Sequence, residues 1–221
     1  MQGEETEGTA MLKLFYAPGA CSLAPHIALY EAGADFEAVR LDLKAGDQRQ
    51  PDYIAVNPKG RVPALVTPRG TLTEAPVILG WIAEQFPAQR LKPEGDDFAV
   101  SQMLSFNAYL ASTVHVSFGH LIRPERYADS EAACAEIKAK TPANLELQLG
   151  LVEETLADGR PWAMGEQYTV ADAYLYVFAR WLERPGAGGI APFPRLKAHR
   201  GRMQQRPAVA AALAAEDILT V

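Results

Sequence analysis

The spacing of hydrophobic residues in the first part of the chain predicts a strand, a helix and a second strand. A short apolar run at 12–16 ends at the turn-forming pair Pro18-Gly19. Apolar side chains then recur at helical spacing over 23–30, until Gly33 supplies a stop. Over 39–43, apolar and polar residues alternate as they do in a half-buried strand. This first unit is therefore βαβ.

A hairpin and a second helix follow the βαβ unit. The β-prone runs 64–67 and 71–73 are separated by Pro68-Arg69-Gly70, residues that favour a tight turn. Pro76 suits a first helical position, and the helix it opens runs to about Phe86. The order βαβ-ββα predicts one small α/β domain, in which helices pack against a four-stranded sheet.

Everything after a linker at 87–97 has helical spacing. The expected helices cover 98–122, 130–157, 169–183, 194–205 and a short segment from Pro207. Pro142 lies inside the second of these, and we expect it to kink or split that helix at Thr141, because proline lacks a backbone N–H. The sequence thus predicts an α/β domain over 11–86 and an all-α domain over 98–221.

Length and composition fit two small domains with no nucleic-acid or membrane partner. A chain of 221 residues can bury a core in each half. No apolar run reaches the roughly 18 residues that a spanning helix needs. The net charge is −6, and the Lys and Arg residues are scattered along the chain rather than gathered in a basic stripe for phosphate backbones.

The N-terminus and the cysteines indicate a cytoplasmic protein. Residues 1–10 are acidic and polar, unlike the basic start and apolar core of a signal peptide, so we expect a disordered extension. Cys21 and Cys134 are the only cysteines, and we expect free thiols rather than a disulfide. No metal-ligand spacing occurs, so no metal cofactor is expected.

Cys21 is the first candidate for chemistry. It lies in the turn just before a helix, where unpaired backbone N–H groups and the helix dipole favour an anion. Moving a thiol pKa from about 8.5 to about 6.5 needs roughly 2.7 kcal/mol, which the dipole and one or two donors can supply. Candidate donors are the groups of Cys21 itself, Ser22 and Tyr16. In the alternative interpretations Cys21 is an inert half-buried cysteine and Tyr16 simply an aromatic residue at a strand end.

Three segments together resemble the soluble glutathione transferases, most closely the bacterial beta class. They are LFYAPGACSLAPHIAL at 14–29, NPKGRVPAL at 57–65 and TVADAYLYVFARW at 169–181. The resemblance extends over nearly all of residues 11–217. It implies a thioredoxin-like, glutathione-binding first domain, a helical second domain with a pocket for the electrophilic substrate, and a homodimer. Glutathione would be the co-substrate.

The resemblance also assigns a glutathione site. It implies that the Val62-Pro63 peptide is cis and that the Val62 backbone exchanges hydrogen bonds with the cysteinyl part of glutathione. Arg61 is assigned to the same site. Glu74 stands where an acidic residue binds the γ-glutamyl ammonium. Ala75 replaces the commoner serine, so the γ-glutamyl carboxylate would depend on its backbone N–H at the helix start.

The helical domain supplies the remaining candidates. His115 matches a histidine that reaches the glutathione sulfur region in beta-class enzymes, although a lone helical histidine is commonly just partly buried or solvent-facing. Trp181 matches an aromatic residue at the border of the electrophile pocket, with Phe118 and Tyr176 as neighbours. Core packing is the competing interpretation of these three. Ala108 stands where beta-class relatives can carry an asparagine that contacts glutathione.

Three functions follow from the resemblance. The first is conjugation of the glutathione thiolate to small hydrophobic electrophiles, in which Cys21 should stay protonated because adjacent like charges oppose each other. The second is a glutathione-dependent peroxidase or disulfide reductase that uses Cys21 covalently. Ala24 rather than a second cysteine follows three positions later, so a resolving partner is missing. The third is a noncatalytic binding protein, which Ala75 and Ala108 would favour.

Overall fold

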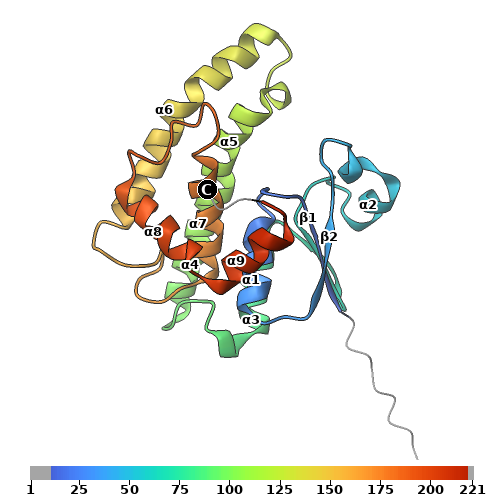
Figure 1. Ribbon diagram of the computed structural model, residues 1–221, viewed down its shortest axis with the longest axis vertical. Coiled ribbons are helices and arrows are strands. Elements are labelled where there is room, and N and C mark those ends of the chain that lie inside the picture. The colour runs from blue at the N-terminus through green and yellow to red at the C-terminus, as the bar shows by residue number, and fades with distance from the viewer. Residues whose placement is uncertain (1–10, 219–221) are drawn as a thin grey trace, which may run out of the picture.

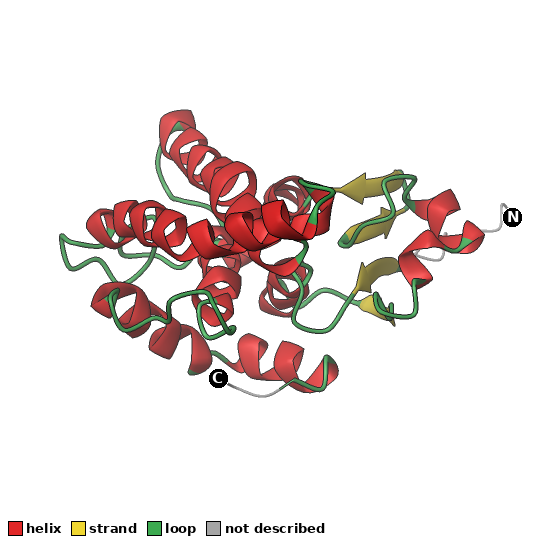
Figure 2. Ribbon diagram, turned by 90° about the horizontal axis from the view of Figure 1, so that it is seen from above, coloured by secondary structure: helices red, strands yellow, loops and turns green. Residues whose placement is uncertain are grey.

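The computed structural model describes residues 11–218, so the predicted extension at 1–10 lies outside the described residues. Figures 1 and 2 show one sheet on one side of the molecule and a group of helices on the other. The predicted fold class is confirmed: a thioredoxin-like βαβ-ββα domain precedes an all-helical one. None of the described helices is long and apolar enough to span a membrane.

The four strands β1 (Leu12–Tyr16), β2 (Phe36–Arg40), β3 (Ala64–Thr67) and β4 (Gly70–Thr73) form a sheet in the order β2-β1-β3-β4. β1 runs parallel to β2, which requires a crossover, and helix α1 (Leu23–Glu31) supplies it. β3 pairs antiparallel with both β1 and β4. Because Phe15 pairs with Ala64, the turn that follows β1 lies beside the segment that precedes β3.

The second strand begins and ends three residues before the predicted 39–43. After β2, the side chain of Asp42 accepts backbone N–H groups and turns the chain. Leu41 and Leu43 are apolar for another reason, because they pack with Tyr53 of helix α2 (Pro51–Val56) on the outer face of the sheet. The alternating pattern therefore predicted correctly which side chains are buried, but it predicted the position of the strand incorrectly.

Helices cover both faces of the sheet. Helices α1 and α3 (Ala75–Gln85) lie on the face toward the helical domain, where Leu14 and Leu65 join the main core. Helix α2 covers the opposite face with the small second cluster. Two 3₁₀ turns complete this part, η1 (Asp47–Arg49) before α2 and η2 (Pro87–Gln89) after α3.

The second part of the chain is helical, as predicted. Its elements are α4 (Asp97–Tyr109), η3 (Leu110–Val114), α5 (His115–Ile122), η4 (Pro124–Arg126), α6 (Glu131–Thr155), α7 (Val170–Trp181), α8 (Pro194–Gln204) and α9 (Pro207–Ala215). The helix predicted over 98–122 is one helical run with the π-helical segment η3 inside it. Helix α7 is buried along its whole length and contacts α1, α3, α4 and α8.

Helix α6 continues through Pro142, so the predicted split at Thr141 is wrong. A proline removes one N–H···O bond from a helix and crowds the carbonyl of the preceding turn. The Thr141 hydroxyl donates to the Ile137 carbonyl oxygen at 3.0 Å, which keeps one nearby acceptor satisfied. Packing of α6 against α5 and α8 offsets the remaining cost.

The end of α9 ties the helical domain to the turn after β1. Glu216 is fully buried, and its carboxylate accepts the backbone N–H of Gly19 at 2.8 Å. Its other oxygen lies 2.9 Å from Nδ1 of His26 in α1. Figure 1 shows α9 beside α1. Because a buried carboxylate is costly without partners, this contact fixes the position of the turn.

Candidate active site

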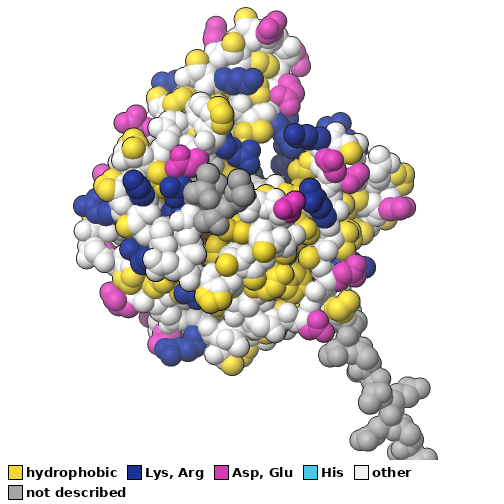
Figure 3. All heavy atoms as spheres, in the orientation of Figure 1, with side chains coloured by type: hydrophobic (Ala, Val, Ile, Leu, Met, Phe, Trp, Pro, Cys, Tyr) yellow, Lys and Arg dark blue, Asp and Glu magenta, His cyan; other side chains and the backbone are white. Residues whose placement is uncertain are grey.

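A cleft of about 610 Å³ opens between the two domains. Figure 3 shows a hollow in this region, with Lys and Arg side chains in dark blue on its rim. One wall comes from the turn after β1, the loop after β2 and the segment before β3, and the other from α5, η4 and the end of α7. Of the predicted site residues, the cleft brings together Cys21, Arg61, Val62, His115 and Trp181.

The turn after β1 is fixed by hydrogen bonds to both the N–H and the carbonyl oxygen of Gly19. Gly19 has φ +65°, a conformation that favours glycine. Its N–H donates to Glu216, and its carbonyl oxygen accepts from Trp181 Nε1 at 2.9 Å and from Arg184 Nη2 at 3.3 Å. Three side chains of the helical domain thus fix the turn that presents Cys21 to the cleft.

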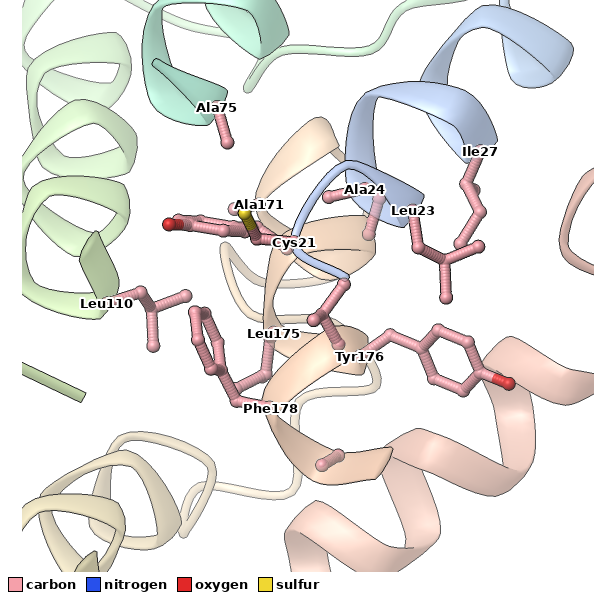
Figure 4. Packing of buried hydrophobic residues seen from close by; sticks show 14 of the residues in the cluster. Cys21, Leu23, Ala24, Ile27, Ala75, Leu110, Ala171, Leu175, Tyr176 and Phe178 are labelled. Carbon is pink, nitrogen blue, oxygen red and sulfur yellow. The ribbon is translucent and has the colours of Figure 1, made fainter. Parts of the chain in front are cut away.

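Cys21 is a buried thiol, with 9% of its surface exposed. Its Sγ donates to the Val62 carbonyl oxygen at 3.5 Å, which links the turn to the segment before β3. Burial raises the pKa of Cys21 to about 12, and the charge of Glu74 adds to this, against the smaller lowering effect of the backbone N–H groups of Cys21 and Ser22. Cys21 is therefore protonated at neutral pH, as the conjugation hypothesis expected, because desolvation outweighs the helix terminus. Figure 4 shows the sulfur near Ala75 and α7.

Two of the predicted sulfur donors are occupied elsewhere. The buried Ser22 hydroxyl accepts the backbone N–H of Ala17 at 3.1 Å and donates to the carbonyl oxygen of the same residue at 3.3 Å. The Tyr16 hydroxyl donates to the Ala215 carbonyl oxygen at 3.2 Å, and burial raises the pKa of Tyr16. Both hydroxyls stabilise the turn and its contact with α9, so the donor role expected of them does not fit this geometry.

The Val62-Pro63 peptide is cis, as the resemblance implied. The segment before it is held by two side chains that sequence reasoning missed. Tyr53 donates its hydroxyl to the Arg61 carbonyl oxygen at 2.5 Å, and Asn57 donates its amide to the same oxygen at 2.6 Å. The Arg61 side chain remains in the cleft. The motif NPKGRVP thus stabilises its own conformation, since the side-chain amide of its asparagine donates to the backbone carbonyl oxygen of its arginine.

Glu74 and Ala75 lie at the start of α3. Glu74 precedes the helix with φ +69°, and 61% of its side chain is exposed. Its carboxylate pairs with Lys59 Nζ at 2.6 Å, a partner that the sequence did not indicate. Ala75 is buried as the first residue of the helix, and Pro76 after it has no backbone N–H to offer. A ligand carboxylate at this end would depend on few backbone donors.

His115 is the first residue of α5, directly after the π-helical segment η3. Such segments re-aim the following side chains, and His115 points to the cleft. Its ring packs on Trp181 and Phe178, with centroids 5.2 and 5.7 Å apart. Burial lowers the pKa of His115 to about 4. The charges of Arg61 and Arg126 lower it further, whereas the charge of Glu74 raises it. The imidazole is therefore neutral at neutral pH.

Only one of the three predicted pocket aromatics lines the cleft, and it is Trp181. Phe118 is fully buried behind it, with ring centroids 5.4 Å apart. Tyr176 is also fully buried, and Figure 4 shows its ring on the side of α7 away from Cys21. Both belong to the core, as the competing interpretation held. Tyr174 faces the other way, because two residues along a helix are about 200° apart.

The location of Tyr174 was missed. Burial raises the pKa of Tyr174 well above the usual range, and the charges of Cys21 and Glu74 raise it further. Its ring contacts Phe178 at 4.9 Å between centroids. The spacing of 174, 178 and 181 marks one helical face, and that spacing was the available signal. Neither Ala108, which is exposed, nor the buried Asn107 beside it is among the residues of the cleft.

The cleft is strongly basic. Its lining holds six cationic side chains: Arg40, Lys44, Arg61, Arg123, Arg126 and Arg184. Among the described residues that line it, Asp42 is the one acidic side chain. These cations are scattered in the sequence, because they come from four separate segments that only the fold brings together. Within residues 11–218, no three His, Cys, Asp or Glu side chains converge as they would around a metal ion.

Comparisons with known proteins agree with this architecture. Residues 10–84 match the model of the glutathione S-transferase N-terminal domain, and residues 111–207 match that of the C-terminal domain. Glutathione S-transferase GstA of Escherichia coli O157:H7 is 39% identical over 214 residues, which cover 94% of this chain and all of the relative.

Two solved structures are similar over nearly their whole length. A glutathione transferase homologue from Sulfitobacter with bound glutathione has a TM-score of 0.87 at 36% identity, and the match covers 95% of this chain and 99% of that one. A bacterial beta-class glutathione S-transferase from Sphingomonas chungbukensis has a TM-score of 0.81 at 40% identity, with 94% and 100% covered.

Proposed function

Because this chain belongs to the glutathione S-transferase family, we propose that it conjugates the glutathione thiolate to small hydrophobic electrophiles in the cleft between its two domains. The observation that carries the proposal is the hydrogen bond from the Cys21 thiol to the Val62 carbonyl oxygen, beside the cis peptide, on the cleft wall opposite His115 and Trp181. This geometry supports a glutathione site against the first domain and an electrophile site against the second.

Different residues of the first domain bind different parts of the glutathione molecule. The Val62 backbone binds the cysteinyl part, the Glu74 carboxylate binds the γ-glutamyl ammonium, and the Ala75 N–H binds the γ-glutamyl carboxylate. Arg61 supplies positive charge beside them. Lys59 must then share Glu74 with the ligand ammonium, since it pairs with that carboxylate at 2.6 Å.

The glutathione sulfur is held as a thiolate by donors rather than by a neighbouring base. A neutral His115 can donate one hydrogen bond to it, and the start of α1 contributes its dipole. A protonated Cys21 can donate a second one when its single S–H turns from the Val62 carbonyl oxygen to the glutathione sulfur. Hydrogen bonds to a charged group contribute about 1.5–3 kcal/mol each, so two of them together exceed the roughly 2.7 kcal/mol needed to lower a thiol pKa by two units. In the reaction the sulfur–carbon bond forms, the leaving group departs with its electron pair, and the thiol proton passes to solvent.

The covalent alternative has less support. A cysteine with a pKa of about 12 is a poor nucleophile at neutral pH, and Ala24 offers no resolving thiol. The noncatalytic alternative is set aside because the relatives are glutathione S-transferases over nearly the whole chain.

We also propose a homodimer in the cytoplasm. Val77 of α3 and Leu104 of α4 are 54% and 47% exposed, and Phe98 at the start of α4 is 69% exposed. These side chains lie on neighbouring helices, since a Cβ at Gly80 would meet Leu104 at 3.8 Å. Sedimentation should give twice the chain mass, and a single-chain mass would contradict the dimer.

The enzyme assay uses glutathione and 1-chloro-2,4-dinitrobenzene, with the uncatalysed rate subtracted. We expect the conjugation rate to saturate with glutathione concentration. Calorimetry should show glutathione binding that saturates over the same concentration range. If no binding occurs at millimolar glutathione, conjugation and the covalent alternative both fail.

A further inference from the structure

The cleft has a charge opposite to that of the whole protein. The chain has a net charge of −6, whereas the cleft lining carries six cationic side chains and one acidic one. The acidic one, Asp42, already accepts the backbone N–H groups of Lys44 and Ala45 in its own turn. A concave surface of one sign concentrates ligands of the other sign, so this cleft attracts anions.

Cations on both walls of the cleft lack carboxylate partners among the described residues. No carboxylate of the described residues forms an ion pair with Arg61, Arg123 or Arg126. Instead these side chains repel one another: burial lowers the pKa of Arg126, and the charges of Arg123 and Arg61 lower it further. A bound anion would relieve this repulsion. Arginines with a purely structural role would be expected to have carboxylate partners instead.

Glutathione alone does not account for all of this charge. It carries two carboxylates, one ammonium and, when ionised, one thiolate. Arg61, Arg40 and Lys44 lie on the first-domain wall, where glutathione is proposed to bind, and they match that charge. Arg123, Arg126 and Arg184 lie on the opposite wall. These three face the second substrate.

The opposite wall combines charge with an apolar surface. Arg184 stacks over the Trp181 ring, with its guanidinium carbon 4.9 Å from the ring centroid, and donates to the Gly19 carbonyl oxygen. Ile122, which is 41% exposed, lies between His115 and Arg123 on the same wall. A flat apolar body can therefore rest on Trp181 and Ile122 while an acidic group reaches the guanidinium groups, which bind carboxylates in a bidentate manner.

We propose that the preferred electrophile is an acid: a small, flat, apolar molecule whose carboxylate or similar anionic group binds Arg123 and Arg126. The inference rests on the proposed conjugation reaction and names its substrate class. The chemistry is unchanged, since the glutathione sulfur forms the bond to carbon and the leaving group departs as an anion.

The test compares two electrophiles that differ in charge alone. They are 4-chloro-3,5-dinitrobenzoate and the neutral amide 4-chloro-3,5-dinitrobenzamide, and each kcat/KM is divided by the uncatalysed rate constant. We expect the wild type to favour the benzoate by tenfold or more, because a charge-assisted hydrogen bond contributes about 1.5–3 kcal/mol. Raising the salt concentration should reduce this ratio, since the arginines are partly exposed.

Variants test which residues cause the preference for the benzoate over the amide. R123Q and R126Q should each lower the benzoate-to-amide ratio severalfold while the rate with the amide is kept. The matched control is R69Q, which removes the same charge from the exposed turn between β3 and β4, at the far end of the sheet. Circular dichroism and thermal melting of each variant establish that it folds.

The outcomes separate the two proposals. Equal normalised rates for benzoate and amide would overturn the acidic substrate and leave conjugation standing, whereas no turnover of either probe would defeat conjugation itself. If R126Q raises the KM for glutathione and leaves the ratio unchanged, the cations serve glutathione and the inference is wrong. An equal loss of the ratio in R69Q would also overturn it, because the effect would then be one of net charge.

Discussion

The two walls of the cleft are built on different principles. The backbone of the first-domain wall is fixed, because side chains bond to it at Gly19 and Val62. Its cationic side chains, Arg40, Lys44 and Arg61, belong to this fixed backbone. The helical wall presents long side chains, Arg123 and Arg126, that have no carboxylate partner among the described residues. The backbone of the first wall is fixed by the fold, whereas the chemistry of the second wall can change whenever one of its side chains is substituted.

This difference fits the two tasks that we propose for the enzyme. Glutathione would be the same molecule in every reaction, so a wall whose backbone is fixed by the fold suits it. An electrophile varies, and a wall of side chains can adapt to it without disturbing the core. The comparison predicts that substitutions behind the first wall change stability and activity together, while substitutions on the second change substrate choice.

The largest effect is expected where the helical domain holds the first wall. Replacing Glu216 by alanine removes the acceptor for the Gly19 N–H and leaves His26 without its buried partner. We expect the free energy of unfolding to fall by about 3–5 kcal/mol, with a loss of kcat/KM for every electrophile. Urea denaturation measures the first quantity and steady-state kinetics the second.

The matched control for this variant is Glu146→Ala, an exposed glutamate on α6. Its unfolding free energy should change by less than about 0.5 kcal/mol. If Glu216→Ala were as stable and active as this control, the first wall would not depend on the end of α9, and the proposed contrast between the walls would fail.

The first wall was also the part that the sequence predicted best. The strand–turn–helix pattern around Gly19, Cys21 and Val62-Pro63 is local, so its chemistry can be read from neighbouring residues. The sequence could not indicate that desolvation raises the Cys21 pKa, because burial comes from α3 and α7. Nor could it show that Tyr16 bonds to Ala215, some 199 positions away.

The helical wall was harder to predict for the same reason. Arg123 and Arg126 lie far from Arg184 in the chain, and their charge appears as a cluster only in the folded protein. Trp181 lines the cleft, whereas the prediction of Tyr176 as its neighbour there is wrong, because Tyr176 is buried in the core. Helical spacing from Trp181 leads to Phe178 and Tyr174 instead, so that error was avoidable.

A smaller effect concerns His115 and acid. Its pKa falls from 6.5 to about 4 on folding, so the unfolded chain binds more protons there between these values. Stability from this residue is therefore full above pH 6.5 and is lost as the pH falls toward 4, by up to about 3 kcal/mol. His115→Asn should remove that part of the acid sensitivity, as measured by urea denaturation at a series of pH values.

His120→Asn, one turn further along α5, is the control for this experiment. Two equal acid profiles for the variants would mean that the lowered pKa does not belong to His115.

The smallest effect separates the donor role of Cys21 from the covalent one. Because its pKa is raised to about 12, Cys21 should react with iodoacetamide at pH 8 far more slowly than an ordinary thiol. Cys21→Ala should keep conjugation and lower kcat/KM about tenfold, the cost of one hydrogen bond to a thiolate. Cys21→Ser, which keeps a donor, should recover most of the loss, and Cys134→Ala on α6 should change nothing. Complete loss of conjugation in both Cys21 variants would show that the sulfur itself reacts, and the first wall would then supply a nucleophile rather than a binding surface.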